Sequence, residues 1–344
     1  MKTPNRWHQP TLRDISEKTN LTVPTVSRIL SGKPGFSNKT VEYVKSVAES
    51  LGYRHNRLVS GMQTGRTGII GAILPVHAEW GAQLLTGLIH ELATFGYVPI
   101  VLDCPSPAMT ELEMINHLLE RRIEGVVLFP SDDTVSDRYF KEIYTRKIPL
   151  ITTVRRLEQV NCPFVGGDDL KSGRLAAKHL IELGHRKLGH LSGVLGMSTG
   201  ADRARGFESV AKAKLGVSVT REAMPGFLPE RKRIRDFLKN NPDITAIYCA
   251  NEAIAVELYS VARSLRISIP KKLSVIAHGG GKLSPLLHPA LTSLTEDSFA
   301  IGQNAANVLL KVIQGKLSHS SANVTVVETR LIERESTAPP PTVK

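Results

Sequence analysis

Two short segments of the 344-residue sequence place a serine or a histidine among glycines, as the active sites of lipases and esterases do. Residues 196–200 read Gly-Met-Ser-Thr-Gly, which fits the G-x-S-x-G turn that exposes a nucleophilic serine. Residues 278–281 read His-Gly-Gly-Gly, which matches the loop whose amides bind an oxyanion in the same enzymes. Together the two segments raise the hypothesis of a hydrolase.

The order of these segments argues against that hypothesis. In α/β-hydrolases the HGGG loop precedes the nucleophile, whereas here it follows about eighty residues later. The choice of His278 or His288 as catalytic base would be arbitrary, and short glycine patterns arise by chance in a chain with 27 glycines. We therefore expect no enzyme, no catalytic residues and no cofactor.

Composition places the chain among ordinary soluble proteins, with 41% hydrophobic and 22% charged residues. No stretch approaches the ~20 apolar residues that cross a bilayer, and the polar N-terminus lacks the apolar core of a secretory signal. Cys104, Cys162 and Cys249 lie far apart without metal-ligand spacing. These features predict a cytoplasmic protein with reduced thiols and no metal site.

Positive charge is concentrated at the N-terminal end. Of the formal net charge of +12, residues 1–67 hold eleven Lys or Arg against four acids, and 11 − 4 gives +7. A compact basic segment favours a polyanionic partner such as nucleic acid. A solvated basic surface is the alternative, and charge alone does not separate the two.

Three helices are expected in the first fifty residues, each starting after a side chain that can cap its first turn: Thr11, Thr22 and Ser37. Only about three residues separate the first two helices. Two short helices joined so tightly, with a third to support them, indicate a helix-turn-helix.

From Gly68 onward, short apolar strands alternate with amphipathic helices. This alternation is typical of parallel sheets built from βαβ units. The strands are too numerous for one small sheet, so the fold class is α/β with two doubly wound lobes. The end of the chain, residues 336–344, is rich in proline and is expected to be a disordered tail.

The sequence closely resembles the LacI/GalR (lactose-repressor) family of transcription regulators, and the likeness runs over nearly the whole chain. The segments that carry it are TVSR in the second helix, LGY ending the third with an Asn after it, TGRTGIIG entering the core, and then HLIELGHRKLGHLSG, RARGF, CANEAIAVE, SVIAH and HPALTSL. The resemblance implies an N-terminal helix-turn-helix domain and a two-lobed core like a periplasmic binding protein.

The family pattern sets the expected domain boundaries. They are 1–54 for the helix-turn-helix domain, 55–67 for a hinge helix or linker, and 68–335 for an effector-binding and dimerisation core. Within this core the N-lobe is expected over about 68–163 and 291–324, and the C-lobe over about 164–290 and 325–335.

By resemblance, the second helix would lie in the major groove of DNA. Arg28 can offer a bidentate fork to guanine, whereas Val23 and Pro24 can only favour thymine methyl groups or fit by shape. Hydroxyl side chains around them suit phosphate or base hydrogen bonds. The expected DNA-binding residues are Thr11, Thr22, Val23, Pro24, Thr25, Ser27, Arg28, Ser37, Thr40, Tyr53, Asn56 and Met62.

Residues 56–62 match the family's hinge helix, which places an apolar wedge in the minor groove. Met62 stands where the wedge is usually Leu and is still a plausible intercalator. His55 replaces the usual Pro, and Gly61 costs helix roughly 1 kcal/mol relative to Ala. A plain flexible linker is the alternative.

The glycines of the opening segment align with a loop that binds the family's effector. Gly279 and Gly280 stand where the family has acids, and Val154 followed by Arg155 stands at a second acidic position. Since glycine amides and cations attract anions, we expect an anionic effector such as a sugar acid or a phosphorylated metabolite. Loss of effector binding is the alternative. The expected effector-binding residues are Trp80, Arg155, Thr199, Arg203, Phe227, Asn251, His278, Gly279 and Lys282.

The sequence is therefore interpreted as a transcriptional regulator of this family, with a repressor favoured over an activator. The resemblance implies a homodimer on pseudo-palindromic double-stranded operator DNA, with a small-molecule effector and no membrane contact. A sugar-binding protein or a hydrolase is the alternative, which the N-terminal helix-turn-helix disfavours.

Overall fold

The structure is a computed structural model, and the chain divides into two compact units, residues 1–67 and 68–344, which are described separately. No helix in the described part of the chain is long and apolar enough to cross a membrane. The described residues are 10–54, 66–105, 108–131, 143, 145–157, 160–225 and 229–342.

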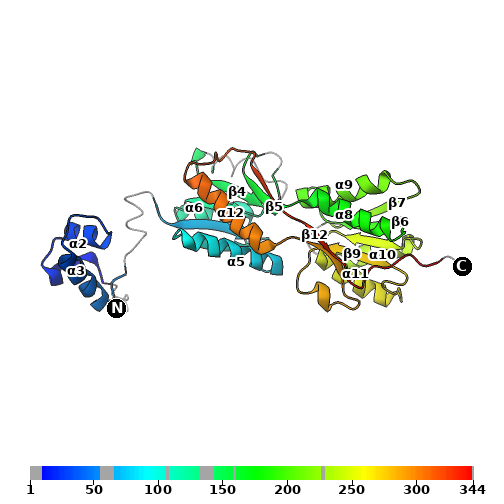
Figure 1. Cartoon of the computed structure of the whole chain (residues 1–344), viewed down its shortest axis with the longest axis horizontal. Helices are drawn as coiled ribbons and strands as arrows, with labels where there is room; N and C mark the ends of the chain where they lie inside the picture. Colours follow the sequence, from blue (N-terminus) through cyan, green and yellow to red (C-terminus); the bar gives the residue numbers. More distant parts are fainter. Residues whose placement is uncertain are drawn as a thin grey trace. The chain divides into compact units, whose positions relative to one another are not determined.

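The first unit contains the three predicted helices, α1 (Leu12–Thr19), α2 (Val23–Leu30) and α3 (Asn38–Ser50) (Figure 1). Thr11 and Asp14 form a reciprocal capping box at the start of α1. The Thr22 hydroxyl accepts a hydrogen bond from the amide of Thr25, and the Ser37 hydroxyl caps α3 in the same way. The caps proposed from local residue chemistry are confirmed.

The turn between α1 and α2 passes through Asn20 in the left-handed region, with φ of 55°. This conformation reverses the chain within a few residues and is one that Asn tolerates. The helices then bury one small core, whose fully or nearly buried members are Ile15, Val26, Ile29, Val44 and Ala48.

The second unit begins with a six-stranded parallel sheet in the order β11-β5-β4-β3-β1-β2. Its strands are β1 (Ile69–Leu74), β2 (Val98–Asp103), β3 (Gly125–Leu128), β4 (Leu150–Thr153), β5 (Phe164–Gly167) and β11 (Val324–Val327). Helices α5 (Glu79–Thr94) and α12 (Ser298–Ile313) bury one apolar cluster with this sheet, while α6 (Glu111–Glu120) contributes to another.

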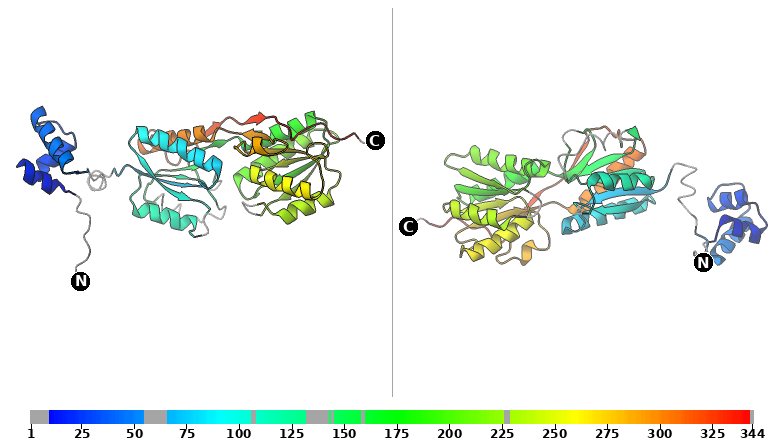
Figure 2. Two further views of the ribbon diagram at one scale, coloured as in Figure 1. Left: turned by 90° about the horizontal axis from the view of Figure 1, so that it is seen from below. Right: turned by 180° about the vertical axis from the view of Figure 1, so that it is seen from behind.

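A second six-stranded sheet has the order β12-β10-β9-β8-β6-β7, parallel except for the β10–β12 pair. Figure 2 shows the lobe that contains it, coloured mostly green to yellow. Its strands are β6 (Lys187–Ser192), β7 (Ser218–Ala223), β8 (Ala246–Cys249), β9 (Ser274–His278), β10 (Thr292–Thr295) and β12 (Arg330–Ile332). Helices α8 (Asp169–Glu182) and α9 (Ser198–Lys212) pack in one apolar cluster of this lobe. Helices α10 (Arg231–Asn240) and α11 (Glu252–Ser264) pack in the other. A short 3-10 helix, η1, spans Ser284–Leu286. The two doubly wound lobes are confirmed.

The chain crosses between the two lobes three times, after β5, after β10 and after β11. The expected lobe boundaries are wrong at all three places. β5 pairs with β4 and belongs to the N-lobe, β10 pairs with β9 and belongs to the C-lobe, and β11 pairs with β5. Strand pairing joins residues far apart in the sequence, so local patterns of short strands do not reveal it.

The expected disordered tail is also wrong over residues 336–342. Ser336 is fully buried, and its carbonyl accepts a hydrogen bond from the amide of Val275. The Ala338 amide donates to the hydroxyl of Ser274, and a ring nitrogen of His185 lies 2.8 Å from the Ala338 carbonyl. Backbone groups of this terminal segment thus form hydrogen bonds with buried groups of β9. The proline-rich composition does not indicate such contacts.

Close helix contact in the C-lobe depends on glycine. A Cβ added at Gly173 in α8 would lie 2.2 Å from the carbonyl oxygen of Arg203 in α9, and one at Gly206 would lie 2.2 Å from the carbonyl oxygen of Leu170. These reciprocal contacts allow the backbones of α8 and α9 to touch, and they hold Arg203 against the start of α8.

Candidate functional site

The first candidate site is the exposed face of α2. Val26 and Ile29 point into the core of the first unit, while Val23, Pro24 and Arg28 lie on the opposite, exposed face. Val23 is 38% exposed and adds apolar contact area to this face. Arg28 lies over the ring of Phe36, with 5.4 Å between the guanidinium carbon and the ring centroid. The arrangement presents one cation beside apolar contact area.

Several hydroxyls expected to contact DNA already hold helix ends. Thr22 and Thr25 share a side-chain hydrogen bond of 2.9 Å, and Ser37 and Thr40 share one of 2.8 Å. These four hydroxyls retain acceptor capacity at exposed helix starts. The remaining expected positions are Thr11, which caps α1, the half-buried Ser27 and Tyr53, and Asn56 and Met62, which lie outside the described residues.

The second candidate site lies where the carboxyl ends of strands from both lobes meet, the usual ligand edge of parallel sheets. On the N-lobe side, Trp80 and Arg155 both contact Phe129, which follows β3. The guanidinium of Arg155 lies 4.5 Å from that ring centroid and donates a 3.2 Å hydrogen bond to the carbonyl of Pro130. Burial, and then repulsion from Arg203, lowers the pKa of Arg155 to about 10.

On the C-lobe side, Arg203 forms a buried ion pair with Asp169, the first residue of α8. Its Nε donates to Asp169 Oδ1 at 2.6 Å, and its Nη1 donates to the carbonyl of Ala250 at 2.6 Å. Burial disfavours the charge on this guanidinium, but the Asp169 carboxylate more than compensates and raises the pKa of Arg203. Arg203 therefore bonds both to the start of α8 and to the carbonyl that follows β8.

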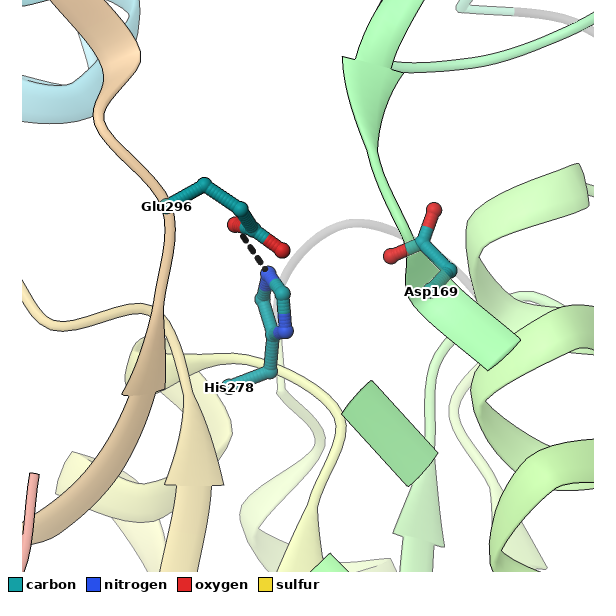
Figure 3. Close-up of side chains that lie close together, drawn as sticks. All are labelled: Asp169, His278 and Glu296. Carbon is teal, nitrogen blue, oxygen red and sulfur yellow. Dashed lines mark ion pairs between the residues drawn. The ribbon is translucent and has the colours of Figure 1, made fainter. Parts of the chain in front are cut away.

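His278 joins this cluster from the end of β9. Its Nδ1 shares a 2.8 Å hydrogen bond with Ser172 of α8, and its Nε2 lies 3.1 Å from Oε2 of Glu296 (Figure 3). Glu296 also accepts a 2.9 Å hydrogen bond from Thr329. Burial would raise the pKa of Glu296, but His278 and Arg203 lower it to about 2, so this buried carboxylate is ionised.

Sequence reasoning missed the two carboxylates of this cluster. It noted only that the acids at two family positions are replaced in this chain, and it did not name Asp169 or Glu296 as site residues. Both residues follow the end of a strand, Asp169 after β5 and Glu296 after β10, and a polar residue at that position is the signal that could have revealed them.

The glycine loop after His278 lies between acidic side chains of both lobes. Gly279 has a φ of 98°, a conformation that favours glycine. A Cβ at Gly281 would lie 2.8 Å from Oε2 of Glu79 and 3.0 Å from Oε2 of Glu252. Lys282 was expected to attract an anion, but it contacts Glu79 instead. Its backbone amide donates a 2.8 Å hydrogen bond to the Glu79 carboxylate. The Lys282 side chain is 82% exposed, and its ammonium lies 3.9 Å from the same carboxylate.

A second contact between the lobes involves Arg156. Its amide donates a 2.9 Å hydrogen bond to the hydroxyl of Ser198, and its guanidinium pairs with Asp202 of α9. Asp202 is almost completely buried and also accepts from Arg205. The lobes are thus joined at Glu79–Lys282 and at Arg156–Asp202, in addition to the three chain crossovers.

The remaining expected effector residues have structural roles or lie elsewhere. Thr199 is buried in the first turn of α9. Asn251 caps α11, and its Oδ1 accepts a 2.9 Å hydrogen bond from the amide of Ile254. Phe227 lies outside the described residues.

The hydrolase alternative can be tested against the same contacts. Ser198, the serine of the GMSTG segment, accepts from Arg156 and is not a hydrogen-bond partner of His278. Ser172, His278 and Glu296 do form a Ser-His-Glu chain, but Ser172 is fully buried inside α8, where no substrate can reach its hydroxyl. An acyl-transfer nucleophile must face its substrate, so neither serine forms a working triad.

Comparisons with known proteins match two parts of the chain to known domains. Residues 11–56 match the family of bacterial regulatory proteins of the lacI type, and residues 177–337 match a periplasmic binding protein-like domain. The ribose operon repressor of Halalkalibacterium halodurans is 25% identical over 328 residues, covering 95% of this chain and 97% of the relative.

Solved structures share the fold. A lac repressor dimer bound to operator and the anti-inducer ONPF superposes with a TM-score of 0.83 at 21% identity, covering 96% of this chain and 99% of that one. The cellobiose complex of the regulator CelR gives 0.70 at 24% identity, covering 95% and 100%. With its lacI-type helix-turn-helix and its two-lobed core, the chain belongs to the LacI family of DNA-binding transcriptional regulators.

Proposed function

We propose that the exposed face of α2 reads the operator, with Arg28 as its base-reading cation. The observation that carries this proposal is the division of α2 into two faces, since Val26 and Ile29 hold the helix while Val23, Pro24 and Arg28 face outward. An exposed helix of this kind, in a unit with a net charge of +7, fits the major groove of a polyanion.

The protein acts, in this proposal, as a homodimeric repressor on a pseudo-palindromic operator. The support is the similarity to a lac repressor dimer bound to its operator. A two-fold dimer presents two recognition helices, so half-sites should be spaced by one helical turn or a multiple of it. Nuclease footprinting on genomic fragments tests this: a protected site with two-fold symmetry is expected, and protection of a single asymmetric half-site would contradict it.

We further propose that a small polar effector binds between the lobes, near Arg155, Arg203, His278 and Gly279. Hydroxyl-rich, uncharged ligands fit best, because Arg203 and Lys282 are each paired with a carboxylate, while Asp169, Glu296, Glu79 and Glu252 supply acceptors. CelR, a protein of the same fold, is known in complex with cellobiose, a neutral sugar.

An anionic effector, as expected from the sequence, is the second candidate. The observation that favours it is the position of the Arg155 guanidinium, which is half-buried at the carboxyl end of β4, rests against the Phe129 ring and donates to the Pro130 carbonyl. A bidentate guanidinium is well suited to a carboxylate or phosphate.

Titration calorimetry with matched pairs of ligands separates the two candidates. Each neutral sugar is compared with its sugar acid and its phosphate ester, in low and high salt. Binding of the neutral sugar that salt does not weaken supports the first candidate. Binding restricted to the charged ligands, and lost in Arg155→Gln, supports the second. Absence of binding by every ligand class would favour a regulator that has lost its effector.

A further inference from the structure

We propose that Asp169, His278 and Glu296 form a site for one divalent transition-metal ion of the zinc class, at the place where the lobes are joined. One ligand atom of each residue lies within 4.8 Å of the ligand atoms of the other two. Figure 3 shows Asp169 facing the His278–Glu296 pair from the opposite element. The three residues also belong to the proposed effector site, so the ion would lie within that site, and its binding can be measured without any effector.

The three side chains are held in place through their other polar atoms. Ser172 holds Nδ1 of His278, Thr329 donates to Oε1 of Glu296, and Arg203 donates to Oδ1 of Asp169. Metal-binding residues are commonly fixed in this way by outer hydrogen bonds, which set the ring orientation and the ligating oxygen. Nε2 of His278 and Oε2 of Glu296 contact each other at 3.1 Å, and an ion bound by these two atoms and by Asp169 would take the place of this contact.

A neighbouring hydroxyl also lacks a well-formed hydrogen bond in the described part of the chain. Tyr248, on β8, is completely buried, and its hydroxyl makes no hydrogen bond of normal geometry, although Ser172 interacts with it and the charges of Arg203, Asp169 and Glu296 act on it. Leaving a buried hydroxyl unbonded costs on the order of 1–3 kcal/mol. A water molecule carried into the cluster by a metal ion would provide such a partner.

The charge balance permits an ion here. Two carboxylates, Asp169 and Glu296, stand against one fixed cation, Arg203, so the acidic groups outnumber the permanent cation by one. The positive charge of Arg203 would repel the ion. The bonds from two carboxylates and an imidazole must therefore contribute more binding free energy than this repulsion removes.

The ligand chemistry selects the metal. One imidazole nitrogen with two carboxylate oxygens suits Zn²⁺, which takes three protein ligands and a water in a tetrahedral site. Mg²⁺ and Ca²⁺ prefer all-oxygen sites of six or more ligands and would bind weakly. Asp169 lies at the crossover after β5, and Glu296 lies at the crossover after β10. The ion would link both residues to His278, which ends β9 just before the glycine loop.

Equilibrium dialysis of the full-length protein against Zn²⁺, after treatment with a chelator, tests the site. About one ion per chain is expected, with at least tenfold weaker binding in Glu296→Gln and in His278→Gln. His77→Ala is the matched control, since His77 and Asp103 form an exposed histidine–carboxylate pair that could bind zinc adventitiously. This control should retain the ion.

Co²⁺ provides a second measurement that needs no variant. Bound to three protein ligands and a water, it should give the intense visible absorption of a four-coordinate site, and Zn²⁺ should displace it. Loss of zinc in His77→Ala with retention in Glu296→Gln would overturn the proposal, as would wild-type protein that gives only the weak spectrum of hydrated Co²⁺. Circular dichroism shows whether each variant is folded. If His278→Gln is unfolded, the zinc binding of Glu296→Gln and the Co²⁺ spectrum of the wild-type protein test the proposal without it.

Discussion

At the scale of single residues, the molecule separates side chains that support the fold from those that can contact a ligand. Arg28 illustrates the second group, because it is exposed on α2 and rests against the Phe36 ring rather than a carboxylate. A guanidinium without an acidic partner is ready to donate to a guanine edge or a phosphate. Its removal should therefore affect DNA binding and leave the fold intact.

Arg28→Ala should weaken operator binding by about 1–3 kcal/mol and relax the preference at one base pair, because a bidentate contact to a base contributes that much discrimination. Fluorescence anisotropy with operator variants measures both effects. Arg13→Ala is the control, since Arg13 is an exposed cation on α1 paired with Glu17. Equal losses of affinity on operator and on random DNA would mean that Arg28 contacts only phosphates.

His190 illustrates the first group. It is completely buried on β6 between Phe207 and Tyr248, and neither ring nitrogen has a hydrogen-bond partner in the described part of the chain. Burial, with repulsion from Arg221 and Arg203, lowers its pKa to about 3. The imidazole is therefore neutral in the folded protein at every moderately acidic pH.

This burial predicts acid sensitivity. The unfolded chain takes up a proton at His190 below about pH 6.5 while the folded chain does not, so the free energy of unfolding should fall as the pH drops from about 6.5 toward 3. The contribution of this residue should approach about 1.4 kcal/mol per pH unit. Urea unfolding across this range should give a shallower pH dependence in His190→Gln than in wild type, whereas the exposed control His117→Gln should match wild type. Identical slopes for His190→Gln and wild type would contradict the assignment.

At the scale of elements, predictions that depend on local chemistry were correct, whereas predictions that depend on long-range strand pairing were not. The capping residues Thr11, Thr22 and Ser37 predicted the three helix starts, because a cap depends only on atoms three residues away. The lobe boundaries failed at β5 and β10, because strand order depends on pairings that no local pattern encodes. Asp169 and Glu296 were missed for the same reason, since only the fold brings them together.

The α8–α9 contact provides a test at this scale. In Gly173→Ala the new methyl would meet the backbone of Arg203 and Phe207, which cannot move aside as a flexible side chain would. We expect a loss of about 1–3 kcal/mol in the free energy of unfolding, typical of overpacking. Gly193→Ala is the control, because its Cβ would meet only ordinary contacts at 3.8 Å and beyond. Thermal unfolding should separate the two variants, and equal stability would show that α8 can shift without cost.

At the scale of the whole effector-binding core, the lobes are held together on two sides. Glu79 bonds Lys282 beside the glycine loop, and Arg156 pairs with Asp202 at the start of α9. Both contacts cross between the lobes, so they can exist only when the lobes are close. A further contact ties two of the crossovers together, because Glu296, after β10, accepts a hydrogen bond from Thr329, after β11.

Arg156→Ala should shift the core toward an open arrangement. Asp202 is almost completely buried and would keep only Arg205 as its cationic partner, so the closed arrangement loses a charged hydrogen bond of about 1.5–3 kcal/mol. A loss of 1.4 kcal/mol already reduces the ratio of closed to open molecules about tenfold. Small-angle X-ray scattering should detect a larger radius of gyration. Arg233→Ala, which breaks ion pairs with Glu222 and Glu230 inside the C-lobe, should leave it unchanged. If both variants scatter like wild type, the crossovers alone hold the lobes in position, and the Arg156 contact has no part in closing them.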